Sequence, residues 1–246
     1  MIESKQNQYV KLVKDLKTKK GRLEHKKLII EGFKSVNDCL KLGVECDFIL
    51  TNCDCELTFE NIPTFKVANS VFDELTSQVT PQGVLGVFKQ PQQVFTKPTT
   101  DFIVLDGLQD AGNVGTILRT ALATGFKRVI LIDCVDAFSQ KVVSSSMTAI
   151  FNLEIQKSKR DEFVKLSKEW DLPIYVADLD GVNALQFKSK CGIIGIVIGN
   201  EGNGVSEELK RIASNIVTLP MDKNIESLNA AVSAGVLMYV LKNNKE

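Results

Sequence analysis

The sequence predicts an α/β protein with two domains, a small N-terminal one and a larger one built on a parallel sheet. Apolar segments typical of buried strands alternate with helical segments throughout the second part of the chain. A polar stretch with two prolines, residues 89–100, interrupts the apolar pattern and is typical of a linker. The length of 246 residues also exceeds that of an average domain. We therefore expect domains at residues 1–95 and 96–246.

The N-terminal domain is predicted to contain short helices and strands. Apolar residues of segment 9–16 fall on one helical face, and Lys19–Arg22 is expected to break that helix as a loop. Residues 28–30 have the pattern of a buried strand, and an amphipathic helix through Val36 and Leu40 follows. Further strands are expected at residues 48–50 and 83–88.

The C-terminal domain is predicted to consist of strands that alternate with helices over most of its length. Its strands are expected at residues 102–105, 129–132, 173–176, 193–198 and 216–219. Its helices are expected at residues 114–124, 161–170, 206–212 (capped by Ser206) and 228–241. Ligands of such sheets bind at the carboxyl ends of the strands, so functional residues are expected there.

The charge of the chain is unevenly distributed. The whole chain is neutral, with 30 basic and 30 acidic residues, and this balance excludes no class of protein. Residues 1–35, however, hold ten Lys and Arg residues against four Asp and Glu residues, a net charge of +6. A basic segment attracts polyanions such as nucleic acid, although a solvated helix face is an equally ordinary explanation.

The composition predicts a cytoplasmic protein that does not cross a membrane. No apolar run reaches the roughly 18–20 residues of a membrane span, and residues 1–5 lack the apolar core of a signal peptide. Six cysteines are present, and the closest pair, Cys53 and Cys55, is separated by one residue, which is shorter than a zinc knuckle. We expect reduced thiols and no metal site.

Three polar, glycine-containing segments carry the candidate chemistry. In the first, Asn113 is expected to cap a helix, and Arg119 lies nearly two turns further on. In the second, residues 199–204, three glycines allow the backbone to approach a ligand closely. In the third, residues 219–221 and 227–229 precede a helix rich in small residues, which allows tight packing.

Each of these segments has an ordinary explanation when it is taken alone. A lone arginine is usually a surface or ion-pairing residue, and small residues in a helix usually reflect close packing. The glycine-rich segment is neither a P-loop nor a dinucleotide fingerprint, which argues against a nucleotide-dependent hydrolase or a dehydrogenase.

Together and in this order, the segments resemble the signatures of the SpoU family of RNA 2′-O-methyltransferases, also called the TrmH family. The signatures are Asn-x-Gly-x-x-x-Arg-Thr-Ala after a strand, a Gly-x-Glu-Gly-x-Gly loop, and Pro-Met followed by Ser-Leu-Asn, and this chain has all three. The resemblance covers about residues 102–241. Less specifically, Ser4-x-x-Asn7, Lys20-x-Arg22 and Ile30-Glu31-Gly32 look like the family's N-terminal substrate-binding domain, which resembles a ribosomal-protein fold.

The resemblance implies a deep trefoil knot in the C-terminal domain that holds S-adenosylmethionine, and a homodimer formed through that domain. Cofactor contacts are carried over to Gly199, Leu219, Met221, Leu228 and Asn229. Catalytic roles are carried over to Asn113, Arg119, Glu201, Ser227 and Asn229. RNA contacts are assigned to Lys11, Lys20, Arg22 and Arg119.

One segment departs from the family pattern Ser-Pro-Lys-x-x-Arg-x-Ser-Met-Gly. In residues 139–148 the arginine is replaced by Ser144 and the glycine by Thr148. Because this loop is expected to help place the substrate, the departure bears on the choice of RNA more than on the chemistry.

The role of Arg119 is left open between two hypotheses. The chain has one histidine, His25, which lies in the basic segment outside the motifs and is expected to face RNA or solvent. A guanidinium has a pKa above about 12 and is a poor base in water. Arg119 therefore either accepts the hydroxyl proton in the assembled site or clamps the phosphate beside the target ribose.

The predicted function is transfer of a methyl group from S-adenosylmethionine to a ribose 2′-hydroxyl of RNA. The separate N-terminal domain favours rRNA, specifically 23S rRNA, over tRNA. A tRNA 2′-O-methyltransferase and a non-catalytic RNA-binding protein on the same fold are the alternatives. The target nucleotide is not indicated by the sequence.

Overall fold

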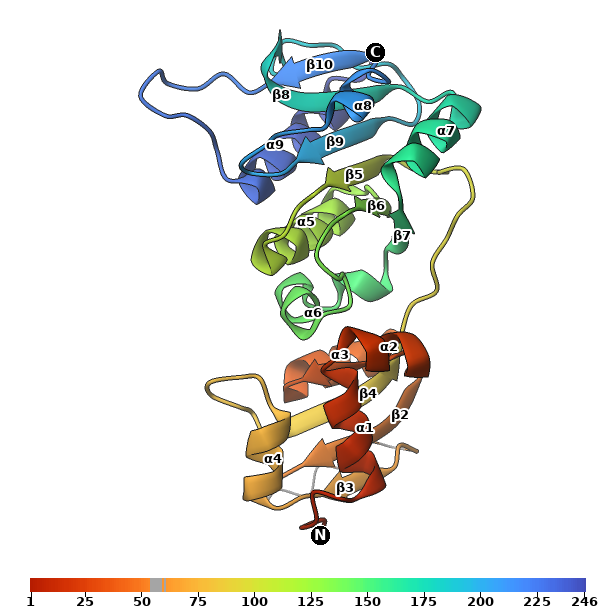
Figure 1. Ribbon diagram of the computed structural model, residues 1–246, viewed down its shortest axis with the longest axis vertical. Helices are drawn as coiled ribbons and strands as arrows, with labels where there is room; N and C mark the ends of the chain where they lie inside the picture. The colour runs from red at the N-terminus through yellow and green to blue at the C-terminus, as the bar shows by residue number, and fades with distance from the viewer. Residues whose placement is uncertain (54–58, 60) are drawn as a thin grey trace. The chain divides into compact units, whose positions relative to one another are not determined.

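The computed structural model describes residues 1–53, 59 and 61–246 (Figure 1). Cys55, one half of the closely spaced cysteine pair, lies outside the described residues. The chain forms two compact units, Met1–Pro91 with Phe138–Phe151, and Gln92–Ala137 with Asn152–Glu246. No helix in the described ranges is long and apolar enough to span a membrane.

The first unit is built on a four-stranded sheet of order β1-β4-β2-β3, in which only the β2–β3 pair is parallel. The strands are β1 Lys27–Glu31, β2 Cys46–Thr51, β3 Thr64–Lys66 and β4 Val84–Lys89. The helices are α1 Gln8–Leu16, α2 Lys19–His25, α3 Phe33–Lys41, α4 Asn69–Leu75 and α6 Gln140–Ser146, with a 3-10 turn η1 at Ala149–Phe151. Apolar side chains of α1 and α4 pack with those of the sheet into one core.

The expected loop at Lys19–Arg22 is wrong, because these residues begin α2. Thr18 caps this helix, and its hydroxyl accepts a hydrogen bond from the Gly21 backbone N–H (3.0 Å). A Cβ at Gly21 would lie 2.1 Å from the Asp15 carbonyl oxygen, so glycine is required where α2 meets the end of α1. This helix is too polar to show the apolar periodicity from which helices are predicted.

Arg22 is also corrected, since it is buried rather than presented to RNA. Its side chain is 6% exposed, and its Nη1 donates to the carbonyl oxygens of Leu16 (2.8 Å) and Lys17 (3.0 Å). These carbonyls are at the C-terminus of α1, where no helical N–H group reaches them. The guanidinium therefore supplies hydrogen-bond donors to the unpaired carbonyl groups at the end of α1.

We predict that Arg22→Met lowers the free energy of unfolding by about 1.5–3 kcal/mol, because two carbonyls lose a charged donor. Thermal and urea denaturation would measure this loss. Lys20→Met, at an exposed position of the same helix, is the control and should change stability little. Unchanged stability of Arg22→Met together with weakened RNA binding would restore the original assignment.

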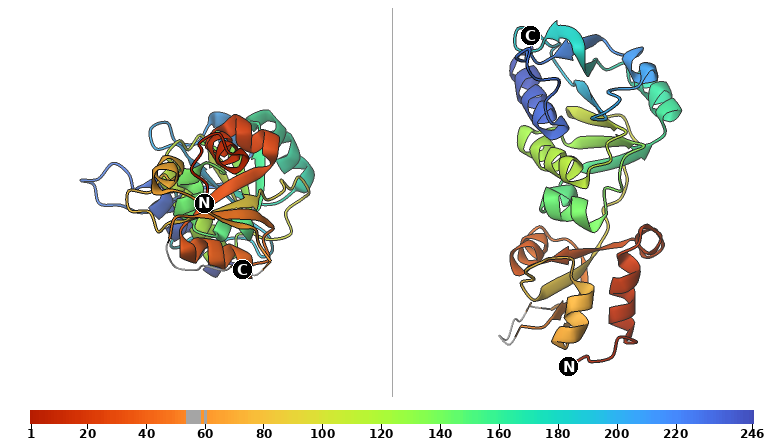
Figure 2. Two further views of the ribbon diagram at one scale, coloured as in Figure 1. Left: turned by 90° about the horizontal axis from the view of Figure 1, so that it is seen from below. Right: turned by 60° about the vertical axis from the view of Figure 1, so that its left-hand side comes forward.

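The second unit contains a six-stranded sheet of order β10-β8-β9-β5-β6-β7, with all neighbouring pairs parallel. Its strands are β5 Phe102–Asp106, β6 Arg128–Ile132, β7 Glu154–Ser158, β8 Ile174–Asn183, β9 Gly195–Gly199 and β10 Asn215–Thr218. Its helices are α5 Ala111–Thr124, α7 Arg160–Trp170, α8 Glu207–Lys210 and α9 Ala230–Asn243. Helices α5 and α9 cover one face of the sheet, and α7 and α8 cover the other (Figure 2).

The predicted α/β class with a parallel C-terminal sheet and a separate N-terminal α/β unit is confirmed. All residues of the central strand β5 are buried, as expected for a parallel strand covered on both faces. The trefoil knot stays a prediction.

Candidate active site

The loops at the carboxyl edge of the second sheet surround a cavity of about 370 Å³, here called the loop cavity. Strands β5 and β9 end in register, with Asp106 paired to Gly199, and residues of the segment after β10 line the same cavity. Six of the predicted site residues line this cavity: Gly199, Glu201, Leu219, Met221, Ser227 and Leu228. Asn113, Arg119 and Asn229 do not.

A bulge in β8 forms one wall of the loop cavity. The pairing of β8 with β10 jumps from Val176–Ile216 to Val182–Val217, which leaves residues 177–181 outside the ladder. Asp178 on this bulge forms an ion pair with Lys210 (2.6 Å). Burial alone would raise the pKa of Asp178, but this ammonium and two backbone N–H groups outweigh it and lower the pKa. The wall therefore carries a stable ion pair.

Gly199 marks the closest backbone approach in the cavity. A Cβ at this position would lie 2.2 Å from the Gly204 carbonyl carbon and 2.3 Å from the Val205 nitrogen. The loop folds back here because Asn200 and Gly204 exchange backbone hydrogen bonds, and the Asn200 Oδ1 accepts from the N–H groups of Gly202 and Asn203. A tight loop with exposed backbone results, which fits the role predicted from its three glycines.

One residue from each of the three motif segments joins a chain of hydrogen bonds beside the loop cavity. Asn229 caps α9 with its Oδ1, so its Nδ2 is free to donate to the Asn113 Oδ1 (2.9 Å). The Asn113 Nδ2 in turn donates to the Glu201 Oε1 (2.6 Å). Because each amide has its oxygen committed, the chain has a single consistent direction, from the α9 N-terminus to the Glu201 carboxylate.

The expected N-cap at Asn113 is wrong, since Asp110 caps α5. The Asp110 Oδ1 accepts from the Asn113 backbone N–H (2.7 Å), and the helix begins at Ala111. Asn113 thus lies in the first turn, and its side chain is released from capping. This release allows it to bridge Glu201 and Asn229.

Arg119 stands apart from this chain of hydrogen bonds. Its side chain is exposed on α5 and, among the described residues, forms no hydrogen bond or ion pair. Asn113 and Asn229 also line a second, open cavity of about 550 Å³ between α5 and α9, here called the helix groove. The two asparagines therefore lie between the loop cavity and the helix groove.

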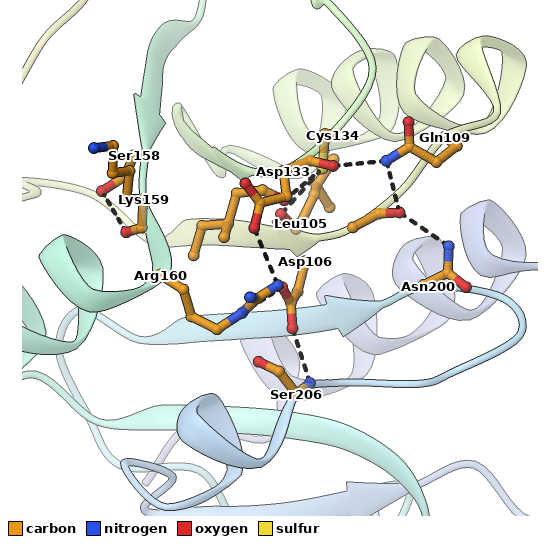
Figure 3. Close-up of polar contacts among 12 residues, drawn as sticks. Leu105, Asp106, Gln109, Asp133, Cys134, Ser158, Lys159, Arg160, Asn200 and Ser206 are labelled. Atoms are coloured by element: carbon orange, nitrogen blue, oxygen red, sulfur yellow. Dashed lines mark hydrogen bonds and ion pairs between the residues drawn. The ribbon is translucent and has the colours of Figure 1, made fainter.

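Sequence reasoning missed a second polar network at the same edge (Figure 3). Asp106, only 2% exposed, accepts from the Arg160 Nη2 (2.8 Å) and from the Ser206 backbone N–H (2.8 Å). Arg160 also pairs with Asp133 (3.3 Å), and hydrogen bonding to Asp106 raises the pKa of Arg160. A carboxylate that ends an apolar strand is a detectable signal, but nothing in the local sequence indicates Arg160 as its partner.

The loop cavity fits a cofactor of the size and charge of S-adenosylmethionine. Its volume falls within the usual range of small-molecule sites, about 300–1,000 Å³. Apolar side chains such as Ile198, Leu219 and Leu237 can cover an aromatic base, and the Gly199–Gly204 backbone offers polar groups to it. The Glu201 carboxylate suits a ligand that carries positive charge, whereas Asp178 is already paired with Lys210.

The parallel sheet, the cavity at its carboxyl edge and the three convergent segments define an α/β enzyme domain with a small-molecule site. The chain belongs to the SpoU rRNA Methylase family, whose model matches residues 101–239. A second model, the MRM3-like substrate binding domain, matches residues 7–86.

Individual relatives match nearly the whole chain. The 23S rRNA (guanosine(2553)-2′-O)-methyltransferase RlmP of Bacillus subtilis is 30% identical over 98% of both chains. The mitochondrial rRNA methyltransferase 3 of Homo sapiens is 27% identical and covers 91% of this chain and 69% of its own. The crystal structure of an AdoMet-bound rRNA methyltransferase from Sinorhizobium meliloti has a TM-score of 0.87 and 26% identity, and covers 98% of this chain and 97% of that one.

Proposed function

We propose that the protein transfers a methyl group from S-adenosylmethionine to a ribose 2′-hydroxyl of 23S rRNA. The observation that carries this proposal is the hydrogen-bonded chain of Asn113, Glu201 and Asn229, which brings the three motif segments together beside the loop cavity. The B. subtilis relative named above acts on the ribose of a 23S rRNA guanosine, and its similarity extends over both units.

The residues of the loop cavity have distinct proposed roles. Gly199, Leu219, Met221 and Leu228 hold the cofactor through backbone and apolar contacts, and Glu201 and Ser227 supply polar contacts. When bound, S-adenosylmethionine supplies an electrophilic methyl group on a positively charged sulfur. Asn113 and Asn229 fix the Glu201 carboxylate in one orientation, and an acceptor must take the proton of the 2′-hydroxyl.

Incubation of the protein with labelled S-adenosylmethionine and total RNA tests the proposal. Label should appear in 23S rRNA at a ribose, mapped by the resistance of 2′-O-methylated positions to alkaline hydrolysis. Label in tRNA alone would support the tRNA alternative. Absence of label in every RNA, together with absence of cofactor binding in calorimetry, would favour the non-catalytic alternative.

We further propose that residues 1–95 bind the RNA and that residues 96–246 carry the chemistry. The MRM3-like match to residues 7–86 and the net charge of +6 in residues 1–35 support this division. Lys11 on α1 and Lys20 on α2 are exposed, and we propose that they contact RNA phosphates. Arg22 is buried and is no longer proposed as such a contact. A cytoplasmic location also stays a proposal.

Replacing both Lys11 and Lys20 by alanine is expected to weaken RNA binding uniformly across sequences. Each lost phosphate contact should reduce the slope of log K against log salt by about 0.7–0.9. Filter binding over a range of salt concentrations measures both effects. Lys168→Ala, at an exposed position of α7, is the control; an equal loss in this variant would show that the effect is not specific to the basic segment.

The helix groove supports the proposal of a homodimer. Val232, Val236 and Tyr239 of α9 are 52%, 38% and 53% exposed, and they form an apolar stripe beside the polar ends Asn113 and Asn229. We propose a second copy of the chain as its occupant, because the stripe is continuous with the site and carries no charged side chain.

Val236→Asp is expected to convert the dimer into a monomer, since a charge would be buried at its centre. Sedimentation velocity measures the change. Val182→Asp, at a position of similar exposure (46%) on β8, is the matched control and should leave the mass unchanged. A wild-type protein that sediments as a monomer at micromolar concentration would contradict the proposal.

A further inference from the structure

Strand β5 has a buried carboxylate at each of its ends. Asp101 precedes the strand and is 7% exposed, and Asp106 ends it and is 2% exposed. Each accepts from one backbone N–H and one cationic side chain: Asp101 from Ile194 and Lys245, and Asp106 from Ser206 and Arg160. The two carboxylates have the same local chemistry, but only Asp106 lies at the edge where the loop cavity opens.

The end of β5 fastens both ends of the glycine-rich loop. At its start, the Asn200 Nδ2 donates to the Gly107 carbonyl oxygen (2.9 Å). At its end, the Ser206 backbone N–H donates to the Asp106 Oδ2 (2.8 Å). The two contacts come from adjacent residues, Asp106 at the end of β5 and Gly107 directly after it, and both are drawn as dashed lines in Figure 3. Glu201, which faces Asn113, lies on the loop between these anchors.

The Asp106 anchor depends on Arg160. A carboxylate that is 2% exposed is strongly destabilised without a compensating charge. Arg160, the first residue of α7, supplies this charge through its Nε (3.3 Å) and Nη2 (2.8 Å), both directed at the Asp106 Oδ1. The Oδ2 is thereby left to hold Ser206. Helix α7, the end of β5 and the glycine-rich loop are thus connected through a single carboxylate.

We propose that Asp106, compensated by Arg160, is a positioning residue that sets the conformation of the 199–206 loop for the methyl donor. The proposal rests on the proposed function, which makes this loop part of the cofactor site. Asp106 lines neither cavity, so it acts through Ser206 and not by touching the ligand.

The test compares Asp106→Asn with Asp101→Asn. The amide cannot hold both Arg160 and Ser206 as the carboxylate does, so the affinity for S-adenosylmethionine should fall by about tenfold or more, and its KM should rise equally. The KM for RNA should stay unchanged. Amide hydrogen exchange at residues 200–206 should accelerate. Asp101→Asn should lose comparable thermal stability with no change in cofactor affinity or in exchange of this loop.

Equal cofactor affinity of Asp106→Asn and the wild type would overturn the proposal, and so would equal losses in the two variants. If Asp106→Asn does not fold, Arg160→Gln replaces it in the test. This variant is expected to bind S-adenosylmethionine more weakly and to exchange the amides of residues 200–206 faster. Unchanged cofactor affinity and unchanged exchange would overturn the proposal. A wild-type protein that does not bind S-adenosylmethionine would contradict the proposed function instead. The exchange comparison would then still decide whether Asp106 holds the loop.

Discussion

Replacing Arg119 by alanine is expected to reduce methylation by roughly a hundredfold or more, with cofactor affinity unchanged. Arg119 lies outside the loop cavity and is exposed on α5, two turns after Asn113, so its proposed partner is the RNA and not the cofactor. Single-turnover methylation assays and calorimetry with S-adenosylmethionine measure the two quantities. Arg211→Ala, at another exposed arginine, is the control.

Arg119→Lys separates the two hypotheses for this residue. A phosphate clamp tolerates an ammonium with weaker geometry, so measurable methylation and a lower RNA affinity should remain. A proton acceptor tuned by its site would not be replaced in this way. An inactive lysine variant with unchanged RNA affinity would therefore contradict the clamp.

Asn113→Asp is expected to lower kcat by roughly a hundredfold, equivalent to about 3 kcal/mol. The amide nitrogen that donates to Glu201 would be replaced by a carboxylate oxygen 2.6 Å from another carboxylate. Two facing carboxylates raise the pKa of one of them. Activity of the variant should then recover as the pH falls through that raised pKa, because the protonated carboxyl donates again.

A pH profile of the variant against the wild type measures this recovery. Asn152→Asp adds the same charge at an exposed position that lines neither cavity and should cost far less. Loss of activity that does not depend on pH would argue that Asn113 acts other than through Glu201.

The alternation of apolar segments was enough to predict the fold class, because both faces of a parallel sheet are covered and its strands are uniformly apolar. It failed for β7, whose sequence Glu-Ile-Gln-Lys-Ser contains one apolar residue. This strand is at the edge of the sheet, where its neighbours include the linker: the Val94 N–H donates to the Ile155 carbonyl, and Gln93 accepts from the Lys157 N–H. The other edge strand, β10, was predicted because Ile216 and Val217 are adjacent apolar residues, and β7 has no such pair.

Only some of the predicted site residues lie together in the structure. The others are placed by contacts with residues that are distant in the sequence. Asp110 and Asn113 are both good N-caps, and the choice between them depends on what Asn113 meets in space, Glu201 and Asn229. Arg22 is in a basic segment and is typical of a phosphate ligand, but it is buried against the C-terminus of α1, where it donates to the Leu16 and Lys17 carbonyls. The role proposed for Asp106 needs a partner 54 residues away.

The Asn113–Glu201–Asn229 chain has a consequence for how the protein matures. Its two hydrogen bonds join residues 88 and 116 positions apart, and the second requires the residue that caps the last helix. Contacts of such long range form slowly, because the entropy of closing a large loop is lost before the contacts contribute any stability. On the ribosome, the N-terminal unit's four-stranded sheet can form before Asn229 has been synthesised. A nascent chain would therefore acquire its proposed RNA-binding segment well before its catalytic centre.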